Sequence, residues 1–436
     1  MYELAKKALD LAEKAGAEEA EIYYVSNHST SVNFKKDALE NAKDHKLEGI
    51  GIRASLNGAV GFASTNAPKE LENTVKSAIA SAKVRESDPD WKGLPSNQKY
   101  PKVAGIYDKR IEGMELEECI GYALELIEGT KEYPGVLPTS GGFTRAKGKQ
   151  LILNTNGIEV EEESTAISGF VDVITLEGET STAYDYDISR KLELDFVNVG
   201  KKASELALKS RNGINVEAGK TEVILHPFAF ADLMEAAFAP SLDADNVQKG
   251  RSGLIGKIGE ELAASELSIY DDGLLEGGIE TSISDDEGIP SQRTTVLEKG
   301  VLKNYLYDNY TAGKAGVKST GNASRGSYTA PPAVGLRNFI IAYPQSDLLS
   351  ETTSGVFVNT LIGAHTANSL SGDFSVEARN AFTIKDGALE KPIKSLMLSG
   401  NAFEILKNIS GAGRDVRKVG GFITPSIRIS DMNVIG

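Results

Sequence analysis

Residues 284–307 read SDDEGIPSQRTTVLEKGVLKNYLY, and this stretch decides the expected fold of the second half of the chain. Two apolar runs, 294–297 and 301–307, flank the turn at residues 298–300, which ends in glycine. Apolar runs around a short glycine turn are typical of a β-hairpin. The pattern returns around Asp386-Gly387. Many short strands joined by glycine turns predict an antiparallel, barrel-like core.

The first half of the chain shows one order of elements twice. Helical spacing of apolar residues is followed by strand-like runs and a closing helix, first in residues 1–86 and again in 113–210. The turns Leu56-Asn57-Gly58 and Leu176-Glu177-Gly178 occupy equivalent places in the two units. We expect a duplicated helix–sheet–helix module, although two unrelated α+β segments with the same order are the alternative. The predicted fold class is therefore α+β.

Two domains are expected, an α+β domain over residues 1–210 and a β-rich domain over 218–436. A polar, turn-rich segment lies between them, and a chain of 436 residues is too long for one small core. A second linker, 87–113, carries three prolines and predicts an extended connection inside the first domain.

Composition narrows the classes of function. Apolar residues make up 40% of the chain and charged residues 25%, as in ordinary globular proteins. The net charge of −15 argues against nucleic acid and against an anionic membrane surface as partners. No apolar run approaches the ~18 residues of a membrane span, and the N-terminus lacks the apolar centre of a signal peptide. A cytoplasmic location is expected.

The nitrogen and sulfur ligands that a zinc site needs are scarce and scattered. The chain has four histidines and one cysteine, and no two of them share a short motif; they are His28, His45, Cys119, His226 and His365. A zinc peptidase commonly places two ligands on one helix face with a nearby glutamate. No window supplies that pattern, so no metal site is predicted in this chain.

Two histidines are candidates for chemistry without a metal. His226 ends an expected strand at a helix entrance, and His365 lies in a polar segment close to Asp373. Either one could serve a serine or a carboxylate in a hydrolase, while a structural hydrogen bond is the simpler interpretation. The acidic run Asp285-Asp286-Glu287 fits no calcium loop and indicates an acidic turn.

Several stretches of the second half carry a family resemblance. Their order and spacing hold through the whole domain; they are residues 243–253, 285–290, 300–306, 319–325, 372–375 and 398–401. In these stretches the chain resembles the TldD/PmbA family of peptidases (peptidase family U62), once called modulators of DNA gyrase.

The resemblance implies two kinds of chain. The TldD kind has a zinc-binding His-Glu-x-x-x-His helix and a later cysteine ligand, whereas the PmbA (TldE) kind lacks them. Here the corresponding window places Glu235 at the first histidine, Ala236 at the glutamate and Pro240 at the second histidine. Residues 419–425 contain no cysteine. The chain is therefore most similar to the PmbA/TldE kind, with a degenerate motif and no catalytic residues of its own.

The resemblance further implies a non-catalytic subunit of a TldD–TldE-type zinc metallopeptidase that cleaves unfolded or extended peptides. A TldD-like catalytic subunit would be the partner and would carry the zinc, with no cofactor in this chain. A dimer is expected, either with that partner or between two copies. Residues expected near the peptide path or the partner surface are Asp243, Asp245, Arg251, Asn322, Arg325, His365 and Asp373. An independent metal-free hydrolase and a gyrase-binding regulatory protein remain alternatives.

Overall fold

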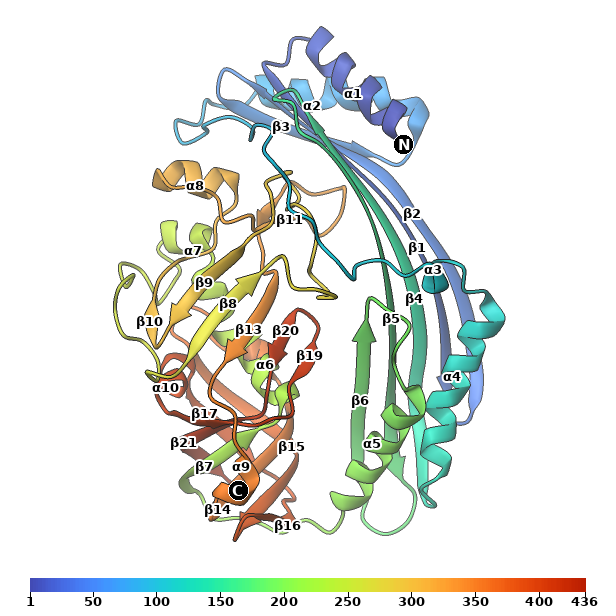
Figure 1. The fold of residues 1–436 in the computed structure, drawn as a ribbon, viewed down its shortest axis with the longest axis vertical. Helices are drawn as coiled ribbons and strands as arrows, with labels where there is room; N and C mark the ends of the chain where they lie inside the picture. The colour runs from blue at the N-terminus through green and yellow to red at the C-terminus, as the bar shows by residue number, and fades with distance from the viewer.

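The computed structural model describes residues 1–436, and its fold is α+β as expected (Figure 1). The N-terminal part is one curved sheet with the strand order β3-β2-β1-β4-β5-β6, in which all neighbours are antiparallel. Its strands are β1 (Glu19–Lys35), β2 (Ala38–Leu56), β3 (Ala59–Thr65), β4 (Val136–Asn154), β5 (Glu159–Thr175) and β6 (Thr182–Ser189). Each of the two expected repeat units contributes three strands to this sheet.

Four helices cover two separate ends of one face of the sheet. They are α1 (Tyr2–Lys14), α2 (Leu71–Lys83), α4 (Leu116–Lys131) and α5 (Phe196–Lys209). The core below α1 and α2 contains Ile22 and Tyr24 of β1, while the core below α4 and α5 contains Val32 and Phe34 of the same strand. Because side chains alternate along a strand, these four residues share one face.

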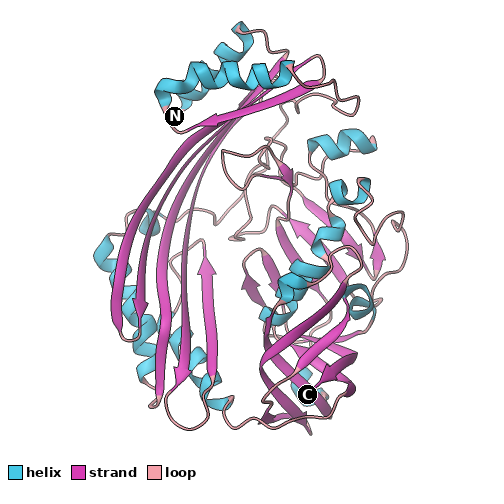
Figure 2. Ribbon diagram, turned by 180° about the vertical axis from the view of Figure 1, so that it is seen from behind, coloured by secondary structure: helices cyan, strands magenta, loops and turns pink.

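The opposite face of the sheet turns toward the C-terminal domain (Figure 2). Tyr23 and Val25, the odd-numbered neighbours on β1, pack with Tyr328 from that domain. The segment 87–113 runs between the two parts, and it contains the short helix α3 (Lys109–Glu112) after a stretch without regular structure. There the Tyr100 hydroxyl donates a hydrogen bond to the Gly288 carbonyl at 2.9 Å.

The C-terminal domain contains the expected barrel. Five strands close in the order β14-β7-β21-β17-β15, because β15 also pairs with β14. They are β7 (Gly219–Leu225), β14 (Ser354–Ile362), β15 (Asp373–Lys385), β17 (Met397–Asn401) and β21 (Ile427–Ile435). Only the β7–β14 pair is parallel. Outside the closed ring, β16 (Ala388–Pro392) pairs with β15 and β18 (Ile409–Ala412) pairs with β21.

A second six-stranded sheet packs beside the barrel in the order β10-β9-β8-β13-β20-β19. Its strands are β8 (Ser268–Asp272), β9 (Arg293–Glu298), β10 (Val301–Leu302), β13 (Asn338–Ala342), β19 (Arg417–Val419) and β20 (Phe422–Thr424). The predicted hairpin forms, and Lys299 and Gly300 both have positive φ in its turn. Its second strand is shorter than predicted, because Leu306 leaves the hairpin to pair with Asp243.

Helix α6 (Pro227–Ala237) lies at the centre of this domain. Its apolar side chains face several directions and most are fully buried, so it belongs to a core of 44 buried residues that spans both sheets. No helix is both long and apolar enough to cross a membrane. The remaining short elements are η1 (Pro68–Glu70), η2 (Ala239–Leu242), α7 (Ala244–Gln248), α8 (Asn309–Ala315), β11 (Ala323–Ser324), β12 (Ala333–Val334), α9 (Leu348–Glu351), η3 (Ala364–Thr366) and α10 (Ala402–Lys407).

Candidate functional site

Four pockets follow one another along α6 and its continuation, and successive pockets share lining residues. The first, of about 460 Å³, shares Tyr184 and Phe228 with the second, of about 320 Å³. Glu235 links the second to the third, of about 270 Å³. Asp243 and Val334 link the third to the fourth, of about 600 Å³. We call this series the pocket row; its first, second and fourth members lie between the N-terminal sheet and the C-terminal domain.

The window that the resemblance places at the metal motif lies at the middle of the pocket row. Glu235 is exposed between the second and third pockets, and Pro240 lines the third. The three motif positions offer one carboxylate, one methyl group and one proline ring, which cannot supply three zinc ligands. Nowhere in the chain do three His, Cys, Asp or Glu side chains group in a way that could hold a metal ion. The residues present therefore do not fit a zinc ion.

A second carboxylate stands beside Glu235 on α6. Burial, followed by the negative charge of Glu235, raises the pKa of Asp232 to about 6. Both residues line the second pocket together with Arg379. This part of the row therefore has an acidic wall whose charge changes close to neutral pH.

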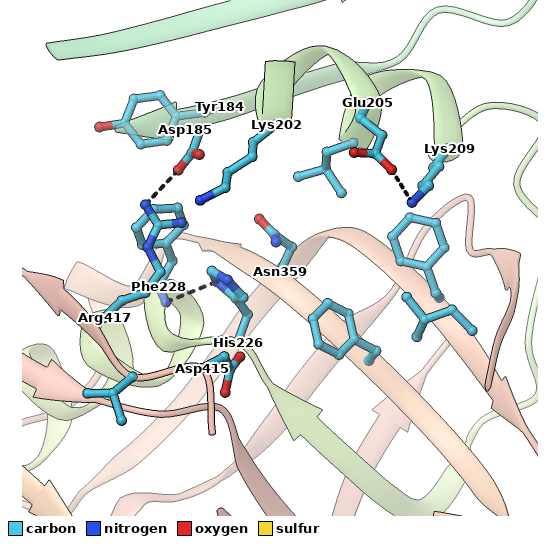
Figure 3. A pocket seen from close by; sticks show the side chains of 15 residues that line it. Tyr184, Asp185, Lys202, Glu205, Lys209, His226, Phe228, Asn359, Asp415 and Arg417 are labelled. Atoms are coloured by element: carbon cyan, nitrogen blue, oxygen red, sulfur yellow. Dashed lines mark hydrogen bonds and ion pairs between the residues drawn. The ribbon is translucent and has the colours of Figure 1, made fainter. Parts of the chain in front are cut away.

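The first pocket surrounds the N-terminus of α6 (Figure 3). His226 caps the helix, because its Nδ1 accepts a hydrogen bond from the Phe228 N–H at 3.3 Å. Burial, followed by the nearby Arg417 charge, lowers the pKa of His226 to about 4. The imidazole is neutral at pH 7, and its Nε2 carries the proton.

The expected residues Asp243, Asp245 and Arg251 cluster at the far end of the row. Asp243 caps α7 by accepting the Asp245 N–H at 2.8 Å, and both aspartates line the fourth pocket. The Asp245 carboxylate pairs with Lys249 at 2.7 Å and with Arg251 at 3.4 Å. The structure thus brings these three together at the edge of the row.

The expected residues Asn322 and Arg325 are both buried, Asn322 inside the C-terminal domain and Arg325 at its junction with the N-terminal sheet. Asn322 donates hydrogen bonds to the Asp271 carboxylate at 2.7 Å and to the Gly335 carbonyl at 2.8 Å. Arg325 pairs with Glu21 of β1. Both side chains therefore hold the framework behind the pocket row.

The acidic turn 285–287 is part of the same junction. Glu287 is fully buried, and its carboxylate accepts from Arg53 at 2.7 Å and from the Asn309 N–H at 2.8 Å. The carboxylate of Asp285 accepts three backbone N–H bonds, yet burial and the Glu287 charge raise its pKa well above the usual range. The sequence indicated an acidic turn, but not that the turn is buried against the first domain.

His365 and Asp373 lie away from the pocket row, on the barrel. His365 is exposed in η3. The Asp373 carboxylate accepts hydrogen bonds from Asn401 at 2.8 Å and Ser371 at 2.7 Å, and these bonds lower its pKa. Neither His365 nor Asp373 forms a hydrogen bond or an ion pair with His226.

Sequence reasoning missed most of the first pocket. Lys202 comes from α5, Asn359 from β14 and Arg417 from β19, so three distant segments meet there. None of the three belongs to a short motif. Only His226 carried a local signal, a histidine before Pro227 at a helix entrance.

Comparison with protein families divides the chain into three matching regions. Residues 20–82 match the PmbA/TldA metallopeptidase domain 1, residues 109–211 the central domain and residues 218–436 the C-terminal domain. An uncharacterized protein of Methanocaldococcus jannaschii is 34% identical over 423 residues, which is 97% of each chain. A protein of Methanothermobacter thermautotrophicus named a metalloprotease is 26% identical and covers 93% of this chain and 90% of its own.

Solved structures share the whole fold. TldE from Thermococcus kodakarensis superimposes with a TM-score of 0.93 at 23% identity, over 99% of this chain and 100% of its own. A Thermotoga maritima protein described as a modulator of a DNA gyrase gives a TM-score of 0.92 at 27% identity, over 99% of each chain. Together with the family matches, these similarities show that the chain belongs to the PmbA/TldD metallopeptidase family.

Proposed function

We propose that this chain is the non-catalytic, TldE-like subunit of a two-subunit peptidase, and that a TldD-like partner carries the zinc. One observation supports the proposal: Glu235, Ala236 and Pro240, which the resemblance places at the metal positions of the motif, provide one carboxylate in place of three functional side chains. The chain would then contribute binding surface and enclosure to the complex rather than the reacting groups.

The pocket row is the proposed path for an extended peptide. β6 is the edge strand of the N-terminal sheet, and Tyr184 and Tyr186 on it line the row. Edge strands offer unpaired main-chain groups to which an extended peptide can add with little selection for sequence. The Tyr186 carbonyl already accepts from Arg417 at 2.7 Å, so the proposed addition involves the other part of the edge.

The test compares the isolated chain with the chain mixed with a TldD-like subunit from the same genome. With zinc and unfolded peptide added, we expect turnover only from the mixture. Val334→Trp, which fills the junction of the third and fourth pockets, is expected to reduce turnover without preventing assembly. Val317→Trp is the control, since Val317 is 51% exposed and lines none of the four pockets. Robust zinc-dependent hydrolysis by the isolated chain would contradict the proposal.

The two alternatives have separate tests. No serine lines the pocket of His226, and its Nδ1 is used to cap α6. The hydrolase alternative therefore predicts loss of activity on His226→Asn or His365→Ala, whereas the subunit proposal predicts that the mixed complex keeps its activity. The gyrase alternative predicts capture of gyrase by the isolated chain, without the TldD-like subunit.

A further inference from the structure

The first pocket contains a buried polar group that the protein leaves without a partner. Asn359 on β14 is only 9% exposed, and its amide oxygen has no hydrogen-bond partner. A buried amide oxygen without a partner destabilises the folded chain. Asn359 points into the pocket between α5 and the barrel (Figure 3). A ligand that donates a hydrogen bond to this oxygen would remove this destabilisation.

Groups that favour an anion surround the same space. Lys202 on α5 extends into the pocket, on the side of Asp185 and Arg417 (Figure 3). Burial raises the pKa of Asp185, and the charges of Arg417 and Lys202 oppose that rise. Lys202 forms no ion pair of its own, whereas the other two cations of the pocket are paired. Arg417 pairs with Asp185 at 3.0 Å, and Lys209 pairs with Glu205 at 2.5 Å. The unused positive charge of the pocket is therefore that of Lys202.

Two further features add to this preference. Because Nδ1 accepts the capping hydrogen bond, neutral His226 carries its proton on Nε2. No acceptor of the protein bonds this Nε2–H. The N-terminus of the 11-residue helix α6 also opens at this point, and its dipole favours negative charge. One charge opposes an anion, because Asp415 is the one acid of the lining without an ion pair. Its two oxygens already accept hydrogen bonds from Ser426, from the backbone N–H at 3.0 Å and from the hydroxyl at 2.6 Å.

The pocket also has an apolar part. Facing α5 are Phe357 and Phe382 of the barrel and Leu389 of β16, while Leu206 follows Lys202 by one turn on α5, next to the Glu205–Lys209 ion pair. This apolar part suits a side chain without charge. The pocket also opens toward the row through Tyr184 and Phe228, the two residues shared with the second pocket.

We propose that this pocket binds the C-terminal carboxylate of a peptide whose last side chain is apolar. Lys202 and the Nε2–H of His226 bind the carboxylate, and the Asn359 oxygen accepts the N–H of the last peptide bond. The apolar part of the pocket takes the terminal side chain, while the rest of the peptide runs into the row. The inference rests on the proposed function, because it assumes that a peptide lies along the pocket row. It adds that the C-terminal end of that peptide binds in the first pocket, at the N-terminus of α6.

The test is calorimetric titration of the isolated chain, without zinc or a partner. The probe is acetyl-Ala-Ala-Leu with a free carboxylate, compared with the same peptide as its C-terminal amide and with N-acetyl-leucine. We expect the amide to bind about tenfold more weakly, as for loss of one charge-assisted hydrogen bond. N-acetyl-leucine is expected to bind more weakly than the peptide; equal binding would overturn the peptide assignment in favour of a small carboxylic acid.

Variants assign the binding to the pocket. Lys202→Ala and Asn359→Ala are expected to weaken the acid peptide about tenfold each, and Lys202→Ala should remove most of the difference between acid and amide. Lys201→Ala is the control, because the neighbouring Lys201 pairs with Glu132 outside the pocket. Equal affinity for acid and amide, or Lys202→Ala behaving like Lys201→Ala, would overturn the proposal.

The outcome is separable from that of the proposed function. Hydrolysis by the mixed complex with no binding of the acid peptide here rejects only the carboxylate pocket. Binding with the expected preference, but no hydrolysis by the complex, supports the pocket and rejects the subunit role.

Discussion

Replacing Arg53 by methionine tests the buried junction between the N-terminal sheet and the C-terminal domain. Arg53 on β2 donates to Glu21 and to Glu287 at 2.7 Å each, and it is 5% exposed. Glu21 retains Arg325 after the substitution, but Glu287 loses its only cationic partner. The change therefore leaves one buried carboxylate without compensation.

The loss in free energy of unfolding expected for Arg53→Met comes from the unpaired Glu287 carboxylate. Breaking a buried ion pair by removing one partner costs about 3–5 kcal/mol. Adding Glu287→Gln removes the uncompensated charge and keeps an acceptor for the Asn309 N–H. The double variant is therefore expected to be more stable than the sum of the single effects predicts, by about 0.5–3 kcal/mol.

The pKa of Glu287 also determines how the stability of Arg53→Met changes with pH. Burial already raises the pKa of Glu287 above its ordinary 4.5, and Arg53 opposes that shift. Without Arg53 the pKa rises further, so the variant loses stability as pH rises above 4.5. Arg53→Met should therefore be less destabilised, relative to the natural chain, at pH 5 than at pH 8.

Urea unfolding measures these effects. The chain has a single tryptophan, Trp91, and the Arg53 guanidinium lies 5.6 Å from its ring centroid. Its fluorescence reports on the junction, and circular dichroism reports on the whole fold. Strictly additive effects of Arg53→Met and Glu287→Gln, or a loss below about 1 kcal/mol for Arg53→Met, would refute the buried, coupled pair.

Three other substitutions have defined outcomes. Phe230→Ala empties a fully buried site in the core around α6 and should cost about 3–5 kcal/mol in urea unfolding; a cost below 1 kcal/mol would contradict the packing. With His226 at a pKa of about 4, the natural chain should lose on the order of 3 kcal/mol as pH falls from 6.5 to 4, and His226→Asn should lack this loss; identical pH profiles would contradict the buried neutral imidazole. Glu235→Gln should lower the pKa of Asp232 from about 6, as followed by carboxyl carbon NMR; an unchanged value would exclude their charge interaction.

Local patterns in the sequence predicted the elements best where turn chemistry is strict. The hairpin turns at Asn57-Gly58 and Asp386-Gly387 form with positive φ at both residues, as their residue types require. The fold class and the barrel followed from the number of such turns. The length of the long strands did not, because exposed polar residues in the middle of β1 and β2 interrupt the apolar pattern without interrupting the ladder.

Contacts between distant segments were beyond reach of the sequence. The acids at 285–287 look like a surface turn, yet in the structure Glu287 pairs with Arg53 of β2 and the Asp285 carboxylate accepts three backbone N–H bonds. Lys202 and Asn359 line the same pocket because α5 faces the barrel across it, and neither residue has a distinctive neighbour in the sequence. The positions Glu235, Ala236 and Pro240 come from the resemblance alone; the first two lie on α6, and Pro240 lies in η2.

Zinc stoichiometry of the purified chain tests the central claim most directly. The chain would be stripped with a chelator, equilibrated with zinc, desalted and measured by mass spectrometry of the metal, alone and in complex with a TldD-like subunit. We predict less than a tenth of an equivalent of tightly held zinc for the chain alone and about one equivalent per complex. One equivalent retained by the isolated chain through its own side chains would contradict the account.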